Sequence, residues 1–192
     1  MKAVLGVRVK SGWASAVLIG SERSSPVFLH RGRLLLADPG VPKSTQPYHR
    51  GFGRLQKDDA ILEKLTGIVY AAAARSLSAF VSECLGRGHE PAAIALVVGS
   101  TIDPERIGNE HIRAHASEAR LFRVALERAA ERVNLPQVTT RERDLRAAFA
   151  TRSGAGLARR IAGLGRVAGR PWGADEKLAA MAAWRAAGDT AV

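Results

Sequence analysis

The chain has 192 residues and a formal net charge of +11, with 46% apolar and 24% charged residues. This length and composition suit one globular domain with a sizeable core and exclude a largely disordered chain. A single cysteine, Cys84, excludes an internal disulfide, and the first ten residues lack the apolar run of a signal peptide. No apolar run approaches the roughly 20 residues of a membrane span. We therefore expect a cytoplasmic protein without a membrane partner.

Three strands are predicted first, at 3–9, 13–20 and 26–38, joined by short turns as in an antiparallel meander. The first strand contains Arg8, although a charged residue is disfavoured in the middle of a core strand. The next segment, 39–57, is rich in Pro, Gly and polar residues. A loop of this length in a compact domain is usually functional or mobile.

The rest of the chain alternates between helices and strands. Apolar periodicity and helix-stop signals predict helix 61–86, strand 92–100, helix 109–133, strand 138–140, helices 142–151 and 155–167 split by Ser153-Gly154, and helix 174–187. Three antiparallel strands followed by alternating helices and strands predict an α/β fold with a five-stranded mixed sheet. This is the order of the ribonuclease H-like fold, as a single domain over 1–192.

The positive charge is concentrated in two segments. Residues 31–57 have a net charge of +5 and residues 141–170 a net charge of +6, so the remainder is balanced. Clustered positive charge is typical of proteins with a polyanionic partner. The alternative is a solvated basic surface without function.

Four stretches resemble the RuvC-like Holliday-junction resolvases in the same order along the chain. They are LGVRVKSGWASAVL, AHASEARLFRVALERAAERVNLPQVTTRERDLRAAF, RSGAGLARRIAGLGR and ADEKLAAMAAW. The resemblance covers most of the chain and skips residues 39–57. It implies phosphodiester cleavage by two Mg²⁺ ions held by carboxylates, one of which bridges both metals from the first strand. It also makes a homodimer plausible.

Only one of the four carboxylate positions implied by this resemblance holds a carboxylate. The bridging position is Arg8, the fourth-strand position falls near Val98-Gly99, and the earlier of the last two acids falls near Trp172. Asp175 matches. A cation in the bridging position repels Mg²⁺. The resemblance thus implies a resolvase frame with a dismantled metal site, in which Arg8 pairs with Asp175.

A second candidate site lies on the helix at 109–133. His111, His115 and Glu118 have the i, i+4, i+7 spacing that places them on one helix face. They can hold a divalent metal if the fold adds a further ligand such as His49 or Asp175. The alternative is a partly buried histidine with a hydrogen-bonded neighbour.

Three acids near loops have two interpretations each. Asp103 and Glu105 follow the fourth strand, where α/β sheets place ligand sites, but Asp-Pro is also an ordinary turn and helix-start signal. Asp38 can neutralise Arg31 or Arg33, or help to hold a cation.

The stretch QPYHRGFG combines Tyr48, His49, Arg50 and Phe52 with flexible glycines. Aromatic and basic residues together suit stacking on an unpaired base, and they equally suit anchoring of the loop. We expect Tyr48 and His49 to line one site together with Arg8 and Asp38.

The stretch RSGAGLARR predicts a Gly-containing turn before a helix, whose N-terminal amides favour phosphate. The residues expected to contact nucleic acid are Arg50, Arg54, Arg152, Arg159, Arg160 and Arg166.

The leading hypothesis is a nucleic-acid-binding protein, with duplex or branched DNA as its partner, that has lost metal-dependent nuclease activity. The alternative is a hydrolase or nuclease that uses His111, His115, Glu118 and Asp175 with Mg²⁺ or Mn²⁺. A third is an interaction module whose long loop binds a protein.

Overall fold

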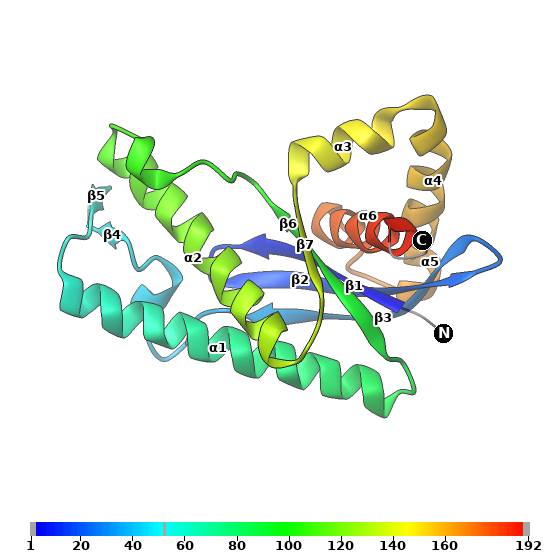
Figure 1. Cartoon of the computed structure of the whole chain (residues 1–192), viewed down its shortest axis with the longest axis horizontal. Helices are drawn as coiled ribbons and strands as arrows, with labels where there is room; N and C mark the ends of the chain where they lie inside the picture. The colour runs from blue at the N-terminus through cyan, green and yellow to red at the C-terminus, as the bar shows by residue number, and fades with distance from the viewer. Residues whose placement is uncertain (1–2, 52, 190–192) are drawn as a thin grey trace.

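A five-stranded mixed sheet lies between two layers of helices in the computed structural model, which describes residues 3–51 and 53–189 (Figure 1). The strand order is β3-β2-β1-β6-β7. The strands are β1 Ala3–Lys10, β2 Trp13–Glu22, β3 Ser25–Leu35, β6 Pro91–Val98 and β7 Gln137–Arg141. β1, β2 and β3 pair antiparallel, whereas β6 pairs parallel with both β1 and β7. The fold class predicted from the sequence is confirmed.

The two faces of the sheet have separate cores. The helices are α1 Asp59–Gly86, α2 Glu110–Arg132, α3 Glu142–Ala150, α4 Arg152–Gly163, α5 Gly165–Ala168 and α6 Ala174–Asp189. Leu5 and Val7 of β1 face α1 and α2, whereas Val4 lies in the core with α6. This alternation follows from the two-residue period of a strand. Arg8 therefore belongs to the face that α6 covers.

The closest packing in this layer is between Gly6 of β1 and α6. A Cβ at Gly6 would lie 1.8 Å from the carbonyl oxygen of Ala179. The alanine-rich face of α6, with Ala179 and Ala183 fully buried, permits this approach. One helical turn toward the N-terminus from Ala179 is Asp175, and two residues along β1 from Gly6 is Arg8. Both steps are about 6–7 Å, so Asp175 lies over Arg8.

Helix α1 departs from one expectation. By length and composition alone it could cross a membrane, with a mean hydropathy of 1.3 over an 18-residue window, so the expectation that no segment meets this criterion is wrong. One third of that window (33%) is buried in the fold. Val69, Leu77 and Phe80 pack in the core with β1 and α2, as in the core helix of a globular domain.

The predicted long loop is more ordered than its composition indicates. It contains a 3-10 turn at Pro42–Thr45 and a hairpin of β4 His49–Arg50 and β5 Arg54–Leu55. Ser44 is buried, where its hydroxyl accepts a hydrogen bond from the Asp38 amide (2.9 Å) and donates to the Val41 carbonyl (2.7 Å).

The predicted helix break at Ser153-Gly154 is wrong. The chain breaks at Thr151, whose hydroxyl caps α4 by accepting a hydrogen bond from the Gly154 amide at 3.1 Å. Gly154 lies in the first turn of α4. Glycine is needed there because a Cβ would lie 2.4 Å from the Ala148 carbonyl oxygen. The Gly-containing stretch is therefore helical and is not the phosphate-binding turn that we expected.

Gly6→Val is expected to destabilise the protein by about 3 kcal/mol or more, because β1 and α6 must separate to admit the side chain. Gly67→Ala is the matched control: Gly67 is exposed in α1 with open space around it. It should raise the free energy of unfolding by roughly 0.5–1 kcal/mol. Urea denaturation measures both, and a tolerated Gly6→Val would contradict the close packing of α6.

Candidate functional site

Arg8 lies where four elements meet at one edge of the sheet. Because β1, β6 and β7 are parallel, their carboxyl ends share this edge, and Arg8 pairs with Val97 across the β1–β6 ladder. β7 runs directly into Glu142, the first residue of α3, and α6 begins one residue before Asp175. This is the edge at which α/β sheets place ligand sites.

The guanidinium of Arg8 is buried in ion pairs, with the residue only 7% exposed. Nη2 bonds to the Glu142 carboxylate, and Nε lies 3.8 Å from the Asp175 carboxylate. Nη1 donates to the carbonyls of Val9 (2.9 Å) and Val97 (3.3 Å). The predicted Arg8–Asp175 pair is confirmed, but Glu142 is the closer partner, and the sequence analysis did not identify it.

Two further cations complete what we call the Arg8 cluster: Arg8, Lys10, Glu142, Arg146 and Asp175. The Lys10 amine lies 3.5 Å from Asp175, and Arg146 lies 2.8 Å from the second oxygen of Glu142. Three cations therefore surround two carboxylates. Because these residues repel Mg²⁺ more than they attract it, they do not fit the two-metal site of the family that the sequence resembles.

A third carboxylate lies beside the Arg8 cluster but is held by neutral donors. Glu176 accepts hydrogen bonds from the Ser15 hydroxyl (3.3 Å) and the Gly173 amide (2.8 Å). Ser15 is opposite Arg8 in the β1–β2 ladder, so the same strand period places both side chains toward α6.

Glu142 keeps its charge in this setting. Burial alone would raise the pKa of its carboxyl group, but the hydrogen bond from Arg146 and the charge of Arg8 outweigh burial and lower the pKa. The Glu142 carboxylate that pairs with Arg8 is therefore ionised at neutral pH.

The other two carboxylate positions implied by the resemblance are filled by apolar side chains. Val98 is buried in the core on the α1–α2 face. Trp172 packs edge-on against Phe28, with ring centroids 5.8 Å apart, and its indole N–H donates to the Ile161 carbonyl at 3.1 Å.

Comparisons with known proteins place this arrangement on a known fold. No protein-family model matches the sequence, and a search of curated proteins gives no match. Solved structures do match. RuvC from Thermus thermophilus in complex with a Holliday junction superposes with a TM-score of 0.56 at 14% identity, over 97% of this chain and 93% of that one. The chain has the RuvC fold.

Another structure of Thermus thermophilus RuvC agrees, with a TM-score of 0.54 at 14% identity over 96% of this chain and 93% of that one. The yeast mitochondrial Holliday junction resolvase Ydc2 gives a TM-score of 0.45 at 12% identity, over 96% of this chain and 79% of that one. The two RuvC structures confirm the resemblance seen in the sequence at the level of the fold.

Three histidines come together on α2 and the β4–β5 hairpin, on the side of the sheet opposite α6. His49 of β4 joins His111 and His115 of α2, and one ligand atom from each lies within 4.8 Å of the others. Nε2 of His111 and Nε2 of His115 are 3.3 Å apart. The sequence analysis required a further ligand, either His49 or Asp175, and the fold brings His49 to His111 and His115.

Beneath these rings lies Glu118, which is fully buried. Its Oε1 is 2.7 Å from Nδ1 of His49, and its Oε2 is 3.9 Å from Nδ1 of His115. Burial raises the pKa of Glu118, against the lowering effect of the His49 hydrogen bond. Burial, followed by the charges of His49 and His111, lowers the pKa of His115 and favours its neutral ring.

Asp175 is not part of this histidine cluster. It lies on α6, across the sheet from α2, in its ion pairs with Arg8 and Lys10. The predicted grouping of His111, His115 and Glu118 with Asp175 is therefore wrong in that one member. His111 and His115 are exposed, so the alternative of a partly buried histidine with a hydrogen-bonded neighbour describes His49 alone.

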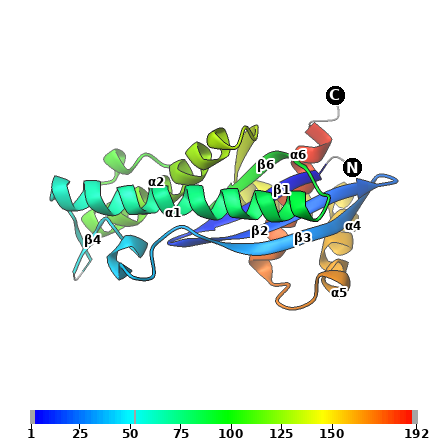
Figure 2. The same cartoon turned by 90° about the horizontal axis from the view of Figure 1, so that it is seen from below.

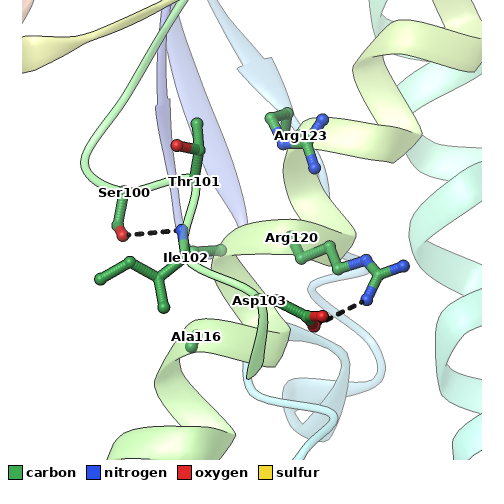
Figure 3. A pocket seen from close by; sticks show the side chains of 8 residues that line it. Ser100, Thr101, Ile102, Asp103, Ala116, Arg120 and Arg123 are labelled. Carbon is green, nitrogen blue, oxygen red and sulfur yellow. Dashed lines mark hydrogen bonds and ion pairs between the residues drawn. The ribbon is translucent and has the colours of Figure 1, made fainter. Parts of the chain in front are cut away.

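The loop after β6 forms a small pocket against α2 (Figure 3). Asp103 forms an ion pair with Arg120 at 3.5 Å and accepts a hydrogen bond from the Glu105 amide at 3.3 Å. The Ser100 hydroxyl accepts from the Ile102 amide at 3.1 Å. These contacts favour the turn interpretation of Asp103 over a ligand site. Glu105 lines a separate cleft.

Asp38 does not pair with Arg31 or Arg33 among the described residues, and its help in holding a cation stays a prediction. Its carboxylate accepts a hydrogen bond from the Gly40 amide at 2.8 Å, which stabilises the turn after β3. Arg33 lies over the Trp13 ring at 4.1 Å, and Arg31 donates to the carbonyls of Arg170 and Pro171.

Tyr48 anchors the loop. It is half-buried against the core of α1 and α2, and burial raises the pKa of its hydroxyl. Phe52 lies outside the described residues. The expected single site lined by Arg8, Asp38, Tyr48 and His49 is not formed, because Arg8 faces α6 whereas Tyr48 and His49 contact the α2 side.

All six arginines expected to contact nucleic acid are exposed, and none forms an ion pair with a described carboxylate. They are Arg50, Arg54, Arg152, Arg159, Arg160 and Arg166. They form two groups at opposite ends of the long axis, the β4–β5 hairpin at one end and α4–α5 at the other, in both views (Figures 1 and 2).

Glu142→Gln is expected to reduce the pH dependence of stability in acid. A carboxyl with a lowered folded pKa contributes stability above its unfolded pKa, near the ordinary 4.5, and loses it as the pH falls through the folded value. The free energy of unfolding of the parent protein should therefore fall more steeply below pH 4.5 than that of the variant. Glu131→Gln, at an exposed residue outside the cluster, is the control. Equal slopes would contradict the assignment.

Arg8→Ala is expected to destabilise the protein by about 3–5 kcal/mol, because it leaves the carboxylates of Glu142 and Asp175 without their buried partner. Arg146→Ala removes a more exposed cation from the same Glu142 and should cost less than about 1 kcal/mol. Chemical denaturation at pH 7 compares the two. Similar losses would show that Arg8 has no special role.

Proposed function

We propose that this RuvC-fold protein binds duplex or branched DNA and does not cleave it by two-metal chemistry at the carboxyl edge of β1. The absence of two-metal cleavage is supported by one observation, the buried Arg8 guanidinium paired with Glu142 and Asp175. It lies where the resembling family needs a bridging carboxylate. A cytoplasmic location belongs to the same proposal.

DNA binding is supported by the arginines that form no ion pair among the described residues. Arg141 and Arg143 form ion pairs with Asp144, and Arg146 forms one with Glu142. From 147 to 174 the sequence contains five arginines and no acid, so the free charge gathers on α4 and α5. Such charge attracts phosphates whatever the base sequence. The RuvC structure with the same fold was determined in complex with a Holliday junction, which supports a nucleic-acid partner.

The separation of the two arginine groups favours a long or branched ligand. Helix α1 runs along the long axis, and its 28 residues span about 42 Å (Figure 2). DNA that contacts both groups must extend over a similar distance, which corresponds to about 12 base pairs at 3.4 Å each. An 8-bp duplex can reach only one group.

Arg159→Ala/Arg160→Ala is expected to weaken binding and to reduce the slope of log K against log salt by about 2, since each lost phosphate contact changes the slope by roughly 1. Fluorescence anisotropy of a labelled 20-bp duplex and of a four-way junction measures this. Lys64→Ala/Arg75→Ala removes two exposed charges of α1 and is the matched control.

An equal loss of slope in this control would show that net charge alone binds DNA. Absence of binding by the parent protein at physiological salt would reject the nucleic-acid proposal and favour a protein-interaction module.

The same samples with Mg²⁺ or Mn²⁺, run on a denaturing gel, test for cleavage. Intact DNA is expected. A second candidate function, a metal-dependent phosphodiesterase, is favoured by one observation, the convergence of three histidines over the buried Glu118. Cleavage that Arg8→Ala leaves unchanged and His115→Ala abolishes would establish this second candidate.

Arg8→Asp is expected to create Mg²⁺ binding. The change places a third carboxylate beside Glu142 and Asp175 and removes the central cation, and carboxylate oxygens are the ligands that Mg²⁺ prefers. The melting temperature of the variant should rise on addition of Mg²⁺, whereas that of the parent should not. A comparable rise in the parent would show that Mg²⁺ binds despite Arg8.

A further inference from the structure

The histidine cluster joins the β4–β5 hairpin to the exposed side of α2. His49 comes from the hairpin, and His111 and His115 come from successive turns of α2. The rings are in mutual edge or tilted contact, with centroids 4.5 Å apart for His49–His115 and 4.6 Å for His111–His115. Each neutral imidazole has one nitrogen that can accept a hydrogen bond or bind a metal, so three rings in contact bring three such nitrogens together.

One nitrogen–nitrogen distance in the cluster already matches the requirement of zinc. Two nitrogens bound tetrahedrally at about 2.0–2.1 Å from Zn²⁺ are about 3.3–3.4 Å apart. Nε2 of His111 and Nε2 of His115 are 3.3 Å apart. The ligand atoms of all three histidines lie within 4.8 Å of one another, so a small rotation of the His49 ring completes the trio.

His49 is held with one nitrogen directed toward this point. With the Glu118 carboxylate accepting from Nδ1 at 2.7 Å, the lone pair of His49 is on Nε2. That Nε2 is buried and has no hydrogen-bond partner among the described residues, and the same holds for Oε2 of the fully buried Glu118. A carboxylate behind a histidine is the usual arrangement around a bound metal, where it fixes the ring and its tautomer.

The hairpin is shaped to reach His111. Gly53 has φ of +73°, and a Cβ there would lie 2.8 Å from Nδ1 of His111. On the other side of the hairpin, Lys57 forms an ion pair with Glu110 at 2.7 Å, one residue before His111. The backbone thus approaches the ring closely on a left-handed glycine.

We propose that His49, His111 and His115 bind one Zn²⁺ ion through their Nε2 atoms. Glu118 acts as the positioning residue for His49, and the fourth tetrahedral position is left to water or to an incoming ligand. Three neutral imidazoles favour zinc over Mg²⁺, which prefers oxygen. The bound ion fastens the hairpin, with Arg50 and Arg54, to α2. The proposal does not depend on DNA binding, and its test measures the metal directly.

The first experiment is titration of the full-length, chelator-treated protein with Zn²⁺ against a chromophoric chelator, and with Co²⁺ by visible absorption. One Zn²⁺ per chain and the intense absorption of tetrahedral Co²⁺ are expected. His115→Ala and His111→Ala, both at exposed positions, should weaken binding by more than about 100-fold, and Glu118→Gln by about 10- to 100-fold. His89→Ala, outside the cluster, is the matched control and should bind as the parent does.

Hairpin fastening has a separate readout. Trypsin cleavage after Arg50 and Arg54, and amide exchange over 48–56, should slow several-fold with Zn²⁺ in the parent and in His89→Ala, but not in His115→Ala. Circular dichroism confirms that each variant is folded. Parent-like zinc affinity in folded His115→Ala, or less than one equivalent of zinc in the parent, would overturn the site. Unchanged cleavage rates with bound zinc would overturn the fastening role.

Discussion

A single buried guanidinium determines how the carboxyl edge of the sheet is built. Arg8 can be buried only because Glu142, Asp175 and two backbone carbonyls surround it, since an unpaired charge in that position is very costly. Those partners come from β6, α3 and α6, so one residue of β1 fixes the meeting point of elements that are far apart in sequence. The edge that holds metal-binding carboxylates in the resembling family is here closed by ion pairs. Positive charge at this point and the exposed arginines of α4 and α5 together support the proposed binding of DNA phosphates without two-metal hydrolysis.

The sheet separates two kinds of chemistry. On the α6 side Glu142 and Asp175 form ion pairs with arginine and lysine, and Glu176 is held by neutral donors. On the α2 side three histidine rings lie above one buried acid, and burial favours the neutral ring of His115.

Much of this architecture was predictable from periodicity and order alone. The antiparallel meander, the buried β6 and the long helices α1 and α2 follow from apolar patterns of the expected period. Glu142 was predictable too, because a residue that follows a parallel strand directly must lie at the carboxyl edge, as Arg8 does. The position of His49 was not predictable, because it depends on how an irregular 19-residue segment folds back onto α2, and loop geometry has no period. The helix break was misplaced because Gly154, which suggests a turn by propensity, is required for its lack of a side chain against Ala148.

The late position of α6 in the chain has a consequence for how the protein emerges from the ribosome. Asp175 is synthesised 167 residues after Arg8. At the 5–20 residues per second of translation, β1 waits on the order of 10–30 s with its α6 face uncovered and its guanidinium hydrated. Contacts of such large separation form late in folding. Until α6 is synthesised, the nascent chain therefore exposes the apolar surface of Val4 and Val17, and later that of Val97, and a chaperone would be expected to cover this strip.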